Sequence, residues 1–198
     1  MFYSLKGILP HVEPSFFVVE CGGVGYKCYT TLTTQRSLPK MGQEIKVYTY
    51  VHVREDAMDI YGFATVMELN CYKMLTGVSG VGPKVGLAIL SELTPEQVAT
   101  SIATNDSKAL TRAAGVGPKL AQRIVLELTD KVKKMDIDDS VVIPKQGVVS
   151  ASSNAGEAVN ALTVLGYSPT DAAAVVAKFD SALPVEELIR LSLKAMAG

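Results

Sequence analysis

The sequence predicts a multidomain α+β protein in which a small β-barrel is followed by helices. Three observations lead to this prediction: β-rich runs fill residues 1–62, helical periodicity begins after Gly62, and a glycine-rich segment occurs twice in the helical part. Because strands and helices are segregated along the chain, a single α/β sheet is not expected. We expect instead a five-stranded OB-fold barrel, a central all-α domain and a C-terminal three-helix bundle.

Residues 1–62 contain five β-rich runs separated by turn signals, which are Phe2–Leu9, Ser15–Cys21, Tyr26–Thr31, Glu44–Val53 and Met58–Phe63. Gly22 and Gly23 lie between two of them, as a tight hairpin turn requires. Five strands rich in β-branched and aromatic residues in so short a segment indicate a closed barrel. An OB-fold is the commonest such barrel, and an SH3-like barrel is the alternative.

The remaining chain divides into three segments. Residues 63–135 have helical periodicity, whereas residues 136–154 combine acidic, Ser, Gly and Pro residues without a period and predict a flexible linker. Residues 155–198 form the last segment, with three expected helices at Gly156–Leu165, Pro169–Phe179 and Pro184–Met196. Ser168 precedes Pro169 as an N-cap would.

Charge and composition exclude several classes of protein. The net charge of −1 is unevenly distributed: it is 0 in residues 1–62, +3 in residues 63–135 and −4 in residues 136–198. Only the middle segment therefore favours an anionic partner. No apolar stretch is long enough to span a membrane, and the N-terminus lacks signal-peptide features, so we expect a cytoplasmic protein without membrane contact. Neither the three cysteines nor the two histidines have metal-ligand spacing, so we expect no metal and no cofactor.

An internal repeat is the most informative feature of the sequence. Residues 79–93 (SGVGPKVGLAILSEL) align with residues 114–128 (AGVGPKLAQRIVLEL) at an offset of 35, and eight of the fifteen positions are identical. Two copies are too few for a solenoid, which needs three or more repeats to bury a core. Two paired helical hairpins therefore fit better, each with a Gly-Val-Gly turn followed by Pro at the start of a helix.

Each hairpin is predicted to bind a phosphate. Glycine permits positive φ and the close approach of another backbone, and the helix that follows offers free N–H groups and the positive end of its dipole. The predicted DNA-binding residues are Gly80, Val81, Gly82, Lys84, Gly115, Val116, Gly117, Lys119 and Arg123. Arg123 follows Lys119 by four residues and should make the second hairpin the stronger one. The alternative is an ordinary tight turn with solvated lysines.

Nucleotide binding is less compatible with these turns. The sequence Gly77-x-x-x-x-Gly82-Pro83-Lys84 imitates a P-loop, but Pro83 separates glycine from lysine and no Ser or Thr follows Lys84. No GxGxxG follows a strand, so dinucleotide binding has no support. The phosphodiester backbone of a nucleic acid is the better ligand, read without regard to base sequence.

These GVGPK segments resemble helix-hairpin-helix motifs, and their context resembles the RuvA family over the full chain. The N-terminal MFYSLKGIL, the segment HVREDAMDIYGF, the tandem helix-hairpin-helix repeat and the C-terminal EAVNALTVLGYSPTDA follow in the order of that family. The chain departs from the usual motif at Gly86, where Ala is common and helix propensity is better, and at Pro118, where relatives are more basic.

The resemblance implies a function that composition alone does not. A RuvA-like protein is a homotetramer, with two tetramers on the DNA as an alternative, and it holds a four-way junction open without a catalytic site of its own. Its C-terminal domain recruits the RuvB-type ATPase motor, which uses the ATP, and a junction resolvase is a further expected partner. Glu55 and Asp56 in the turn before Met58 match the acidic pin of the family, whereas bare sequence suggests only a solvated loop.

Other interpretations of the same residues remain open at this point. Leu162, Leu165, Tyr167 and Val176 form either a core or an exposed face for the partner. The hairpins could also belong to a DNA repair enzyme, although residues after Gly117 offer no catalytic Lys or Asp and no carboxylate cluster. A generic single-strand binder would instead use exposed aromatic rings of the barrel, for which Tyr26, Tyr29, Tyr48 and Tyr50 are candidates.

Overall fold

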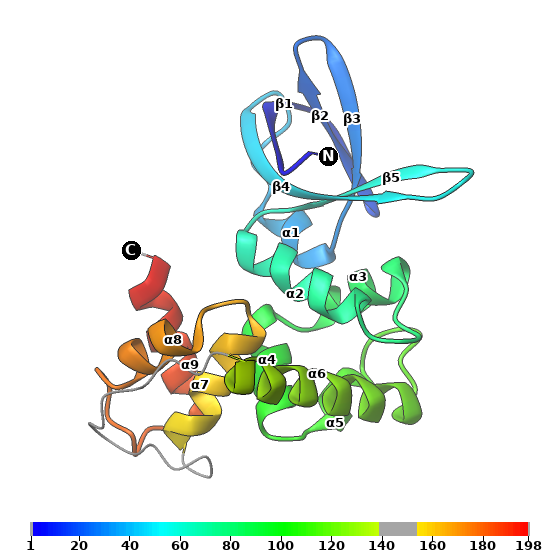
Figure 1. Cartoon of the computed structure of the whole chain (residues 1–198). Helices are drawn as coiled ribbons and strands as arrows, with labels where there is room; N and C mark the ends of the chain where they lie inside the picture. Colours follow the sequence, from blue (N-terminus) through cyan, green and yellow to red (C-terminus); the bar gives the residue numbers. More distant parts are fainter. Residues whose placement is uncertain (1, 139–153, 198) are drawn as a thin grey trace.

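The computed structural model describes residues 2–138 and 154–197, beginning with a closed barrel (Figure 1). The strands are β1 (Ser4–Glu13), β2 (Phe16–Cys21), β3 (Val24–Tyr29), β4 (Glu44–Val53) and β5 (Met58–Phe63). They close in the order β1-β2-β3-β5-β4, with β3 and β5 parallel and the other pairs antiparallel. The predicted five-stranded barrel is confirmed.

The turn between β2 and β3 has the predicted form. Gly22 and Gly23 have φ values of +58° and +82°, and Cys21 pairs directly with Val24. A two-residue hairpin turn with positive φ at both positions matches the right-handed twist of the strands, which is why glycine is favoured there. Inside the barrel the core contains Leu5, Leu9, Phe17, Val19, Cys28, Val47 and Ile60.

A short helix, α1 (Leu32–Ser37), lies between β3 and β4 and was not predicted. Thr31, expected as the end of a strand, is its N-cap: the backbone of Thr31 is extended, and its side-chain oxygen accepts a hydrogen bond from the Thr34 N–H at 3.0 Å. An N-cap residue has strand-like dihedral angles, so local sequence assigns it readily to a strand. Six residues are too few to display a helical period.

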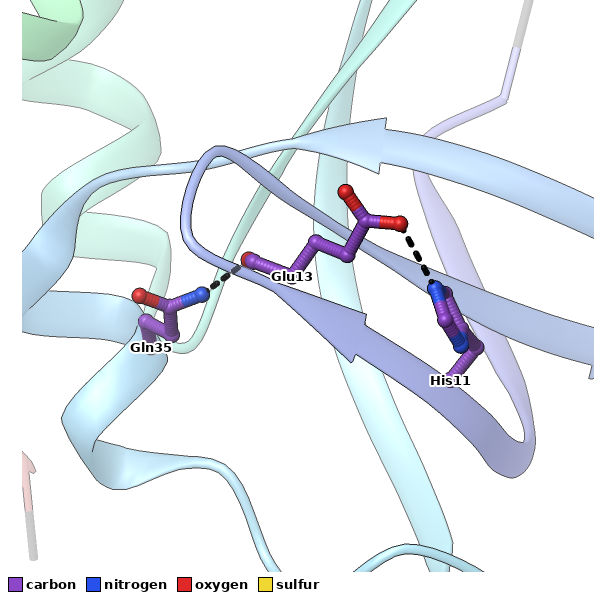
Figure 2. A network of polar contacts seen from close by, with 3 residues as sticks. All are labelled: His11, Glu13 and Gln35. Atoms are coloured by element: carbon purple, nitrogen blue, oxygen red, sulfur yellow. Dashed lines mark hydrogen bonds and ion pairs between the residues drawn. The ribbon is translucent and has the colours of Figure 1, made fainter.

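The side chain of Gln35 ties α1 to the end of β1 (Figure 2). Its Nε2 donates to the backbone carbonyl of Glu13, and Oε1 of Glu13 lies 3.0 Å from Nε2 of His11. This small network is on the surface of the barrel.

The middle of the chain forms two helical hairpins. Its helices are α2 (Val66–Thr76), α3 (Pro83–Glu92), α4 (Pro95–Ala103), α5 (Ser107–Leu110) and α6 (Pro118–Asp138). Helices α2 and α3 make the first hairpin, α5 and α6 the second, and α4 connects them. Helix α6 includes residues 136–138, which were expected to begin the linker, and residues 139–153 lie outside the described residues.

Aromatic rings join the barrel to the first hairpin. The ring of Tyr72 on α2 lies 4.9 Å from Phe63, 5.3 Å from Tyr61 and 5.7 Å from Tyr50, measured between centroids. At these separations aromatic pairs attract each other beyond the gain from burial. The Thr33 hydroxyl adds a hydrogen bond of 2.9 Å to the carbonyl of Leu90 on α3. These contacts hold the barrel and the hairpins as one body.

The last three helices, α7 (Asn154–Val164), α8 (Pro169–Val176) and α9 (Val185–Ala197), form the predicted bundle. Ser168 caps α8 as expected, accepting a hydrogen bond from the Asp171 N–H at 3.1 Å. The bundle was predicted as a separate unit, but α7 and α9 pack against α4, and a single apolar core runs from the hairpins into the bundle.

This shared core changes the interpretation of four residues that were candidates for partner docking. Leu162, Leu165 and Val176 are buried, and Tyr167 is half-buried against the same core. A partner cannot reach the three buried side chains while the bundle is folded. The docking interpretation is therefore wrong for Leu162, Leu165 and Val176, because their apolar surface is used inside the chain.

Candidate nucleic-acid interface

The two repeated turns have the same backbone geometry. In the first, the N–H of Val81 donates to the carbonyl of Val78 at 3.0 Å; in the second, Val116 donates to Ala113 at 3.1 Å. The next helices begin in the same way, with bonds of 3.0 Å from Gly86 to Gly82 and 2.9 Å from Ala121 to Gly117. Each bond recurs at the offset of 35 residues. The sequence repeat is therefore a structural repeat.

The glycines of each turn have different roles. Gly80 and Gly115 have positive φ values of +89° and +83°, a conformation that glycine permits. Gly82 has φ −80° and is the N-cap of α3, and Gly117 is not among the residues with positive φ, so this pair does not use that freedom. A Cβ atom added at Gly82 or Gly117 would meet nothing within 4 Å. These two glycines instead leave open space in front of a helix.

The start of helix α3 is suited to bind an anion. No side chain caps it, and its first turn contains no acidic residue. The first turn of α6 also lacks an acidic residue. Free N–H groups and the helix dipole favour a negative charge at such a terminus. Lys84 and Lys119 are exposed beside the two termini, and neither has an ion pair among the described residues.

The side chains of Val81 and Val116 are only 4% and 5% exposed, which limits how they could contact DNA. Both belong to the apolar core beneath the turns. Of these two predicted DNA-binding residues, only the backbone atoms can therefore reach a ligand. Their side chains anchor the turns to the core.

The two hairpins face each other in a reciprocal arrangement. A Cβ at Gly80 would lie 3.4 Å from Cδ1 of Leu120 on α6, and a Cβ at Gly115 would lie 3.7 Å from Cγ2 of Val85 on α3. Val85 and Leu120 occupy equivalent positions of the repeat. Each turn glycine therefore packs beside the second helix of the opposite hairpin, as a local two-fold relation requires.

Two side chains of α6 form hydrogen bonds with the backbone of Ser79 in the first turn. Nη1 of Arg123 donates to the carbonyl of Ser79, and Oε2 of Glu127 accepts from the N–H of Ser79, each at 3.4 Å. Arg123 was expected to strengthen the second hairpin, but it reaches the first turn because the hairpins pair across the core. Glu127 was missed as a site residue; its identity in both copies of the repeat was the available signal.

Gly86 has a packing reason that its low helix propensity conceals. A Cβ at this position would lie 2.9 Å from Cγ2 of Thr76 and 3.1 Å from Cε2 of Tyr72. An alanine methyl group would therefore require the side chains of Thr76 and Tyr72 on α2 to shift. The glycine that departs from the common motif allows the two helices of the first hairpin to approach closely.

The connection between β4 and β5 contains Glu55 and Asp56, the two residues that the family resemblance predicts to act as an acidic pin. The N–H of Arg54 donates to the carbonyl of Ala57 at 2.8 Å and closes the turn, and Nη2 of Arg54 pairs with Oδ2 of Asp59 at 3.1 Å. Glu55 and Asp56 are exposed at the tip, without an ion pair among the described residues. Figure 1 shows the β4–β5 hairpin extending beyond the rest of the barrel.

The described part of the chain contains no group of three or more His, Cys, Asp or Glu side chains that could hold a metal ion. Burial raises the pKa of the Cys28 thiol to about 12, aided by nearby Cys21, so the thiol stays protonated near neutral pH. No described helix combines the length and apolar character needed to cross a bilayer.

Comparisons with known proteins agree with the order of the elements. Three family models match the chain: RuvA N terminal domain at residues 1–62, SAM-like helix-hairpin-helix tandem at 72–130 and RuvA C-terminal domain at 153–197. A Holliday junction branch migration complex subunit RuvA from Acetivibrio thermocellus is 44% identical, covering 100% of this chain and 99% of its own. The chain belongs to the RuvA family.

Further members of the RuvA family have similar coverage. The relative from Ruminiclostridium cellulolyticum is 39% identical over 99% of this chain and 100% of its own, and the one from Chlorobaculum parvum is 38% identical over 99% and 98%. Both are described as Holliday junction branch migration complex subunit RuvA. Such similarity along the full length supports the resemblance stated from the sequence motifs.

Proposed function

We propose that this protein binds four-way DNA junctions through backbone contacts and holds them open as the non-catalytic subunit of a branch-migration complex. The proposal depends mainly on the two equivalent glycine turns, each of which packs beside the second helix of the opposite hairpin. An exposed acidic hairpin belongs to the same structure. The names of the RuvA relatives support the same function.

Phosphate contacts would come from the two glycine turns. Backbone N–H groups, the helix dipole and one lysine converge at each helix start, and the open space at Gly82 and Gly117 lets a phosphate approach. The assigned residues are Gly80, Val81, Gly82, Lys84, Gly115, Val116, Gly117, Lys119 and Arg123, with Val81 and Val116 acting through their backbones. Because phosphates are the same at every step, this binding is independent of base sequence.

The acidic turn would separate strands at the branch point. Glu55 and Asp56 repel nearby phosphates, at about 1 kcal/mol per charge pair 4 Å apart in water. Repulsion of this size can guide strands but cannot drive migration. The chain therefore needs a motor, and we assign the use of ATP to a RuvB-type ATPase and no cofactor to this protein.

The distribution of charge supports separate partners for the two ends of the chain. Residues 63–135 carry a net +3 and suit DNA, whereas residues 136–198 carry a net −4 and suit a protein. We assign the RuvB-type motor to the C-terminal helices, by surfaces other than the buried Leu162, Leu165 and Val176. We also assign a homotetramer, with an octamer as the alternative on DNA, and a junction resolvase as a further partner. The mass in solution with and without a junction tests the number of copies.

A band-shift series tests the function directly. A four-way junction, a duplex and a single strand of equal length are titrated with protein, without metal or ATP. The proposal expects the junction to bind at least about tenfold more tightly than the duplex, a difference of 1.4 kcal/mol. Equal affinity for all three would contradict it, and cleavage of any strand would favour a repair enzyme.

The generic single-strand binder has weaker support. Its candidate platforms Tyr26, Tyr29, Tyr48 and Tyr50 are all half-buried. Each also lies beside another aromatic ring, with centroid separations of 5.7 to 5.9 Å to Phe2, Tyr61, Tyr3 and Tyr72 respectively. Rings used in this way stabilise the barrel and its joint to α2, and they offer little free face for a base.

A further inference from the structure

Two exposed apolar side chains flank the acidic turn and have no role in the site described above. Val53 ends β4 and Met58 begins β5, and the two residues are directly opposed in the strand register. They are 69% and 62% exposed. Exposed single apolar residues are common, but a cross-strand pair at the tip of a protruding hairpin is a small apolar surface.

This pair continues the apolar face of the barrel beyond the barrel itself. Val51 and Ile60 are the next pair on the same face, because residues two apart in a strand point the same way. Ile60 is buried in the barrel core and Val51 packs against it, whereas Val53 and Met58 lie past its end. The strand face that is buried inside the barrel therefore remains apolar at the end of the hairpin, where it is exposed to solvent.

The charges at the tip restrict which partner can cover this face. Arg54 is paired with Asp59, which leaves the two carboxylates of Glu55 and Asp56 between Val53 and Met58. These carboxylates repel phosphates, and they also repel the same tip of a second copy. The face of a nucleobase is uncharged and apolar, so the two carboxylates do not repel it. DNA-binding proteins also use apolar side chains, Met among them, to contact bases that are partly unstacked.

We propose that Val53 and Met58 form an apolar platform that receives the face of a base unstacked at the branch point. The inference rests on the proposed junction binding and adds a ligand to the same hairpin. Glu55 and Asp56 keep the phosphates away, and a base that has lost its neighbour gains apolar contact two residues from the repelling charges. The hairpin thus combines repulsion of the backbone with attraction of the base.

The test uses a junction with the fluorescent base 2-aminopurine at the branch point, and a second junction with the same base in the middle of one arm. Emission of 2-aminopurine rises when it leaves the base stack. The full-length protein is compared with the V53T/M58Q double variant, which keeps side-chain size but removes apolar surface. The control is V24T, since Val24 is a 53% exposed valine on β3.

At saturating protein, the wild type and V24T are expected to raise emission at the branch point only. The double variant should lose at least about half of that rise, because Thr and Gln remove the apolar surface that receives the unstacked base. A full rise in the double variant would overturn the platform. A full rise with a lower mass in solution would also overturn it and assign the pair to contact between copies. Junction binding is measured separately for the wild type. Failure of the proposed function is thereby distinguished from failure of the platform.

Discussion

The hydroxyl of Tyr72 is buried at the joint between the barrel and the first hairpin, without a hydrogen-bond partner among the described atoms. Burial, followed by the nearby tyrosines, raises the pKa of Tyr72 far above its usual range. The ring itself is in contact with Tyr61 and Phe63. The apolar part of this side chain therefore stabilises the joint, while its oxygen loses hydration and gains no bond in return.

We predict that Tyr72→Phe leaves stability unchanged or raises it by about 1 kcal/mol, because a buried polar group without a partner is removed. The free energy of unfolding from urea titration measures this. Thr33→Ala is the control, since its hydroxyl is bonded to Leu90. That change should lower stability by about 1 kcal/mol. Greater destabilisation by Tyr72→Phe than by the control would mean that the hydroxyl has a partner in solution.

Glu127 is predicted to position the first turn through the N–H of Ser79. Glu127→Ala should weaken junction binding about fivefold, the equivalent of one hydrogen bond of about 1 kcal/mol. Glu127→Gln retains an accepting oxygen and should restore most of the affinity. Glu92→Ala removes the equivalent residue of the first copy and is the matched control. If Glu127→Ala and Glu92→Ala bind the junction with equal affinity, Glu127 has no role in the site, even if the two variants differ in melting temperature.

At the scale of elements, local signals predicted the turns and strands better than the contacts between them. Gly22 and Gly23 marked their hairpin because the turn is defined by its own two residues. By contrast, Arg123 was expected to serve the turn of its own hairpin. It contacts the first turn instead, because the two hairpins pair and bring together residues 44 positions apart. Helical periodicity places a side chain on a face of its own helix but does not say which distant segment covers that face.

Gly82 and Gly117 leave open space in front of the helices that follow the two turns. Gly82→Ala and Gly117→Ala together should lower junction affinity at least about tenfold, because each methyl group occupies the space assigned to a phosphate. Gly42→Ala is the control, at an open turn of the barrel with φ +86°. It should cost about 1–2 kcal/mol of stability from backbone strain without changing affinity. Retained junction affinity in the Gly82/Gly117 variant would contradict the phosphate cradle.

At the scale of the whole molecule, the apolar core is shared more widely than the sequence indicated. Composition separates residues 63–135 from residues 155–198 by a segment without periodicity, which suggested independent units. In the structure, buried residues such as Val98 of α4 and Ala158 of α7 belong to one core. The sequence had predicted each apolar face but could not predict that two of them would cover each other.

This continuity, together with the contacts of the Tyr72 ring with Tyr61 and Phe63 between the barrel and α2, predicts cooperative unfolding of the full chain. Seven of the eight tyrosines lie in residues 1–72 and the chain lacks tryptophan, so near-ultraviolet dichroism reports mainly on the barrel and its joint. Far-ultraviolet dichroism reports mainly on the helices. We expect the two signals to change with the same midpoint temperature, as a two-state transition requires. Separate midpoints would indicate that the barrel and the helices unfold independently.

If the paired turns bind the DNA backbone through Lys84 and Lys119, junction affinity should depend on salt through these two lysines. The slope of log affinity against log salt is measured for the wild type, for K84A/K119A and for the control K178A in the C-terminal bundle. We expect K84A/K119A to reduce the slope by about one for each lysine removed per bound protomer, equally for two junctions of unrelated sequence. An unchanged slope, or a reduction confined to one sequence, would contradict it.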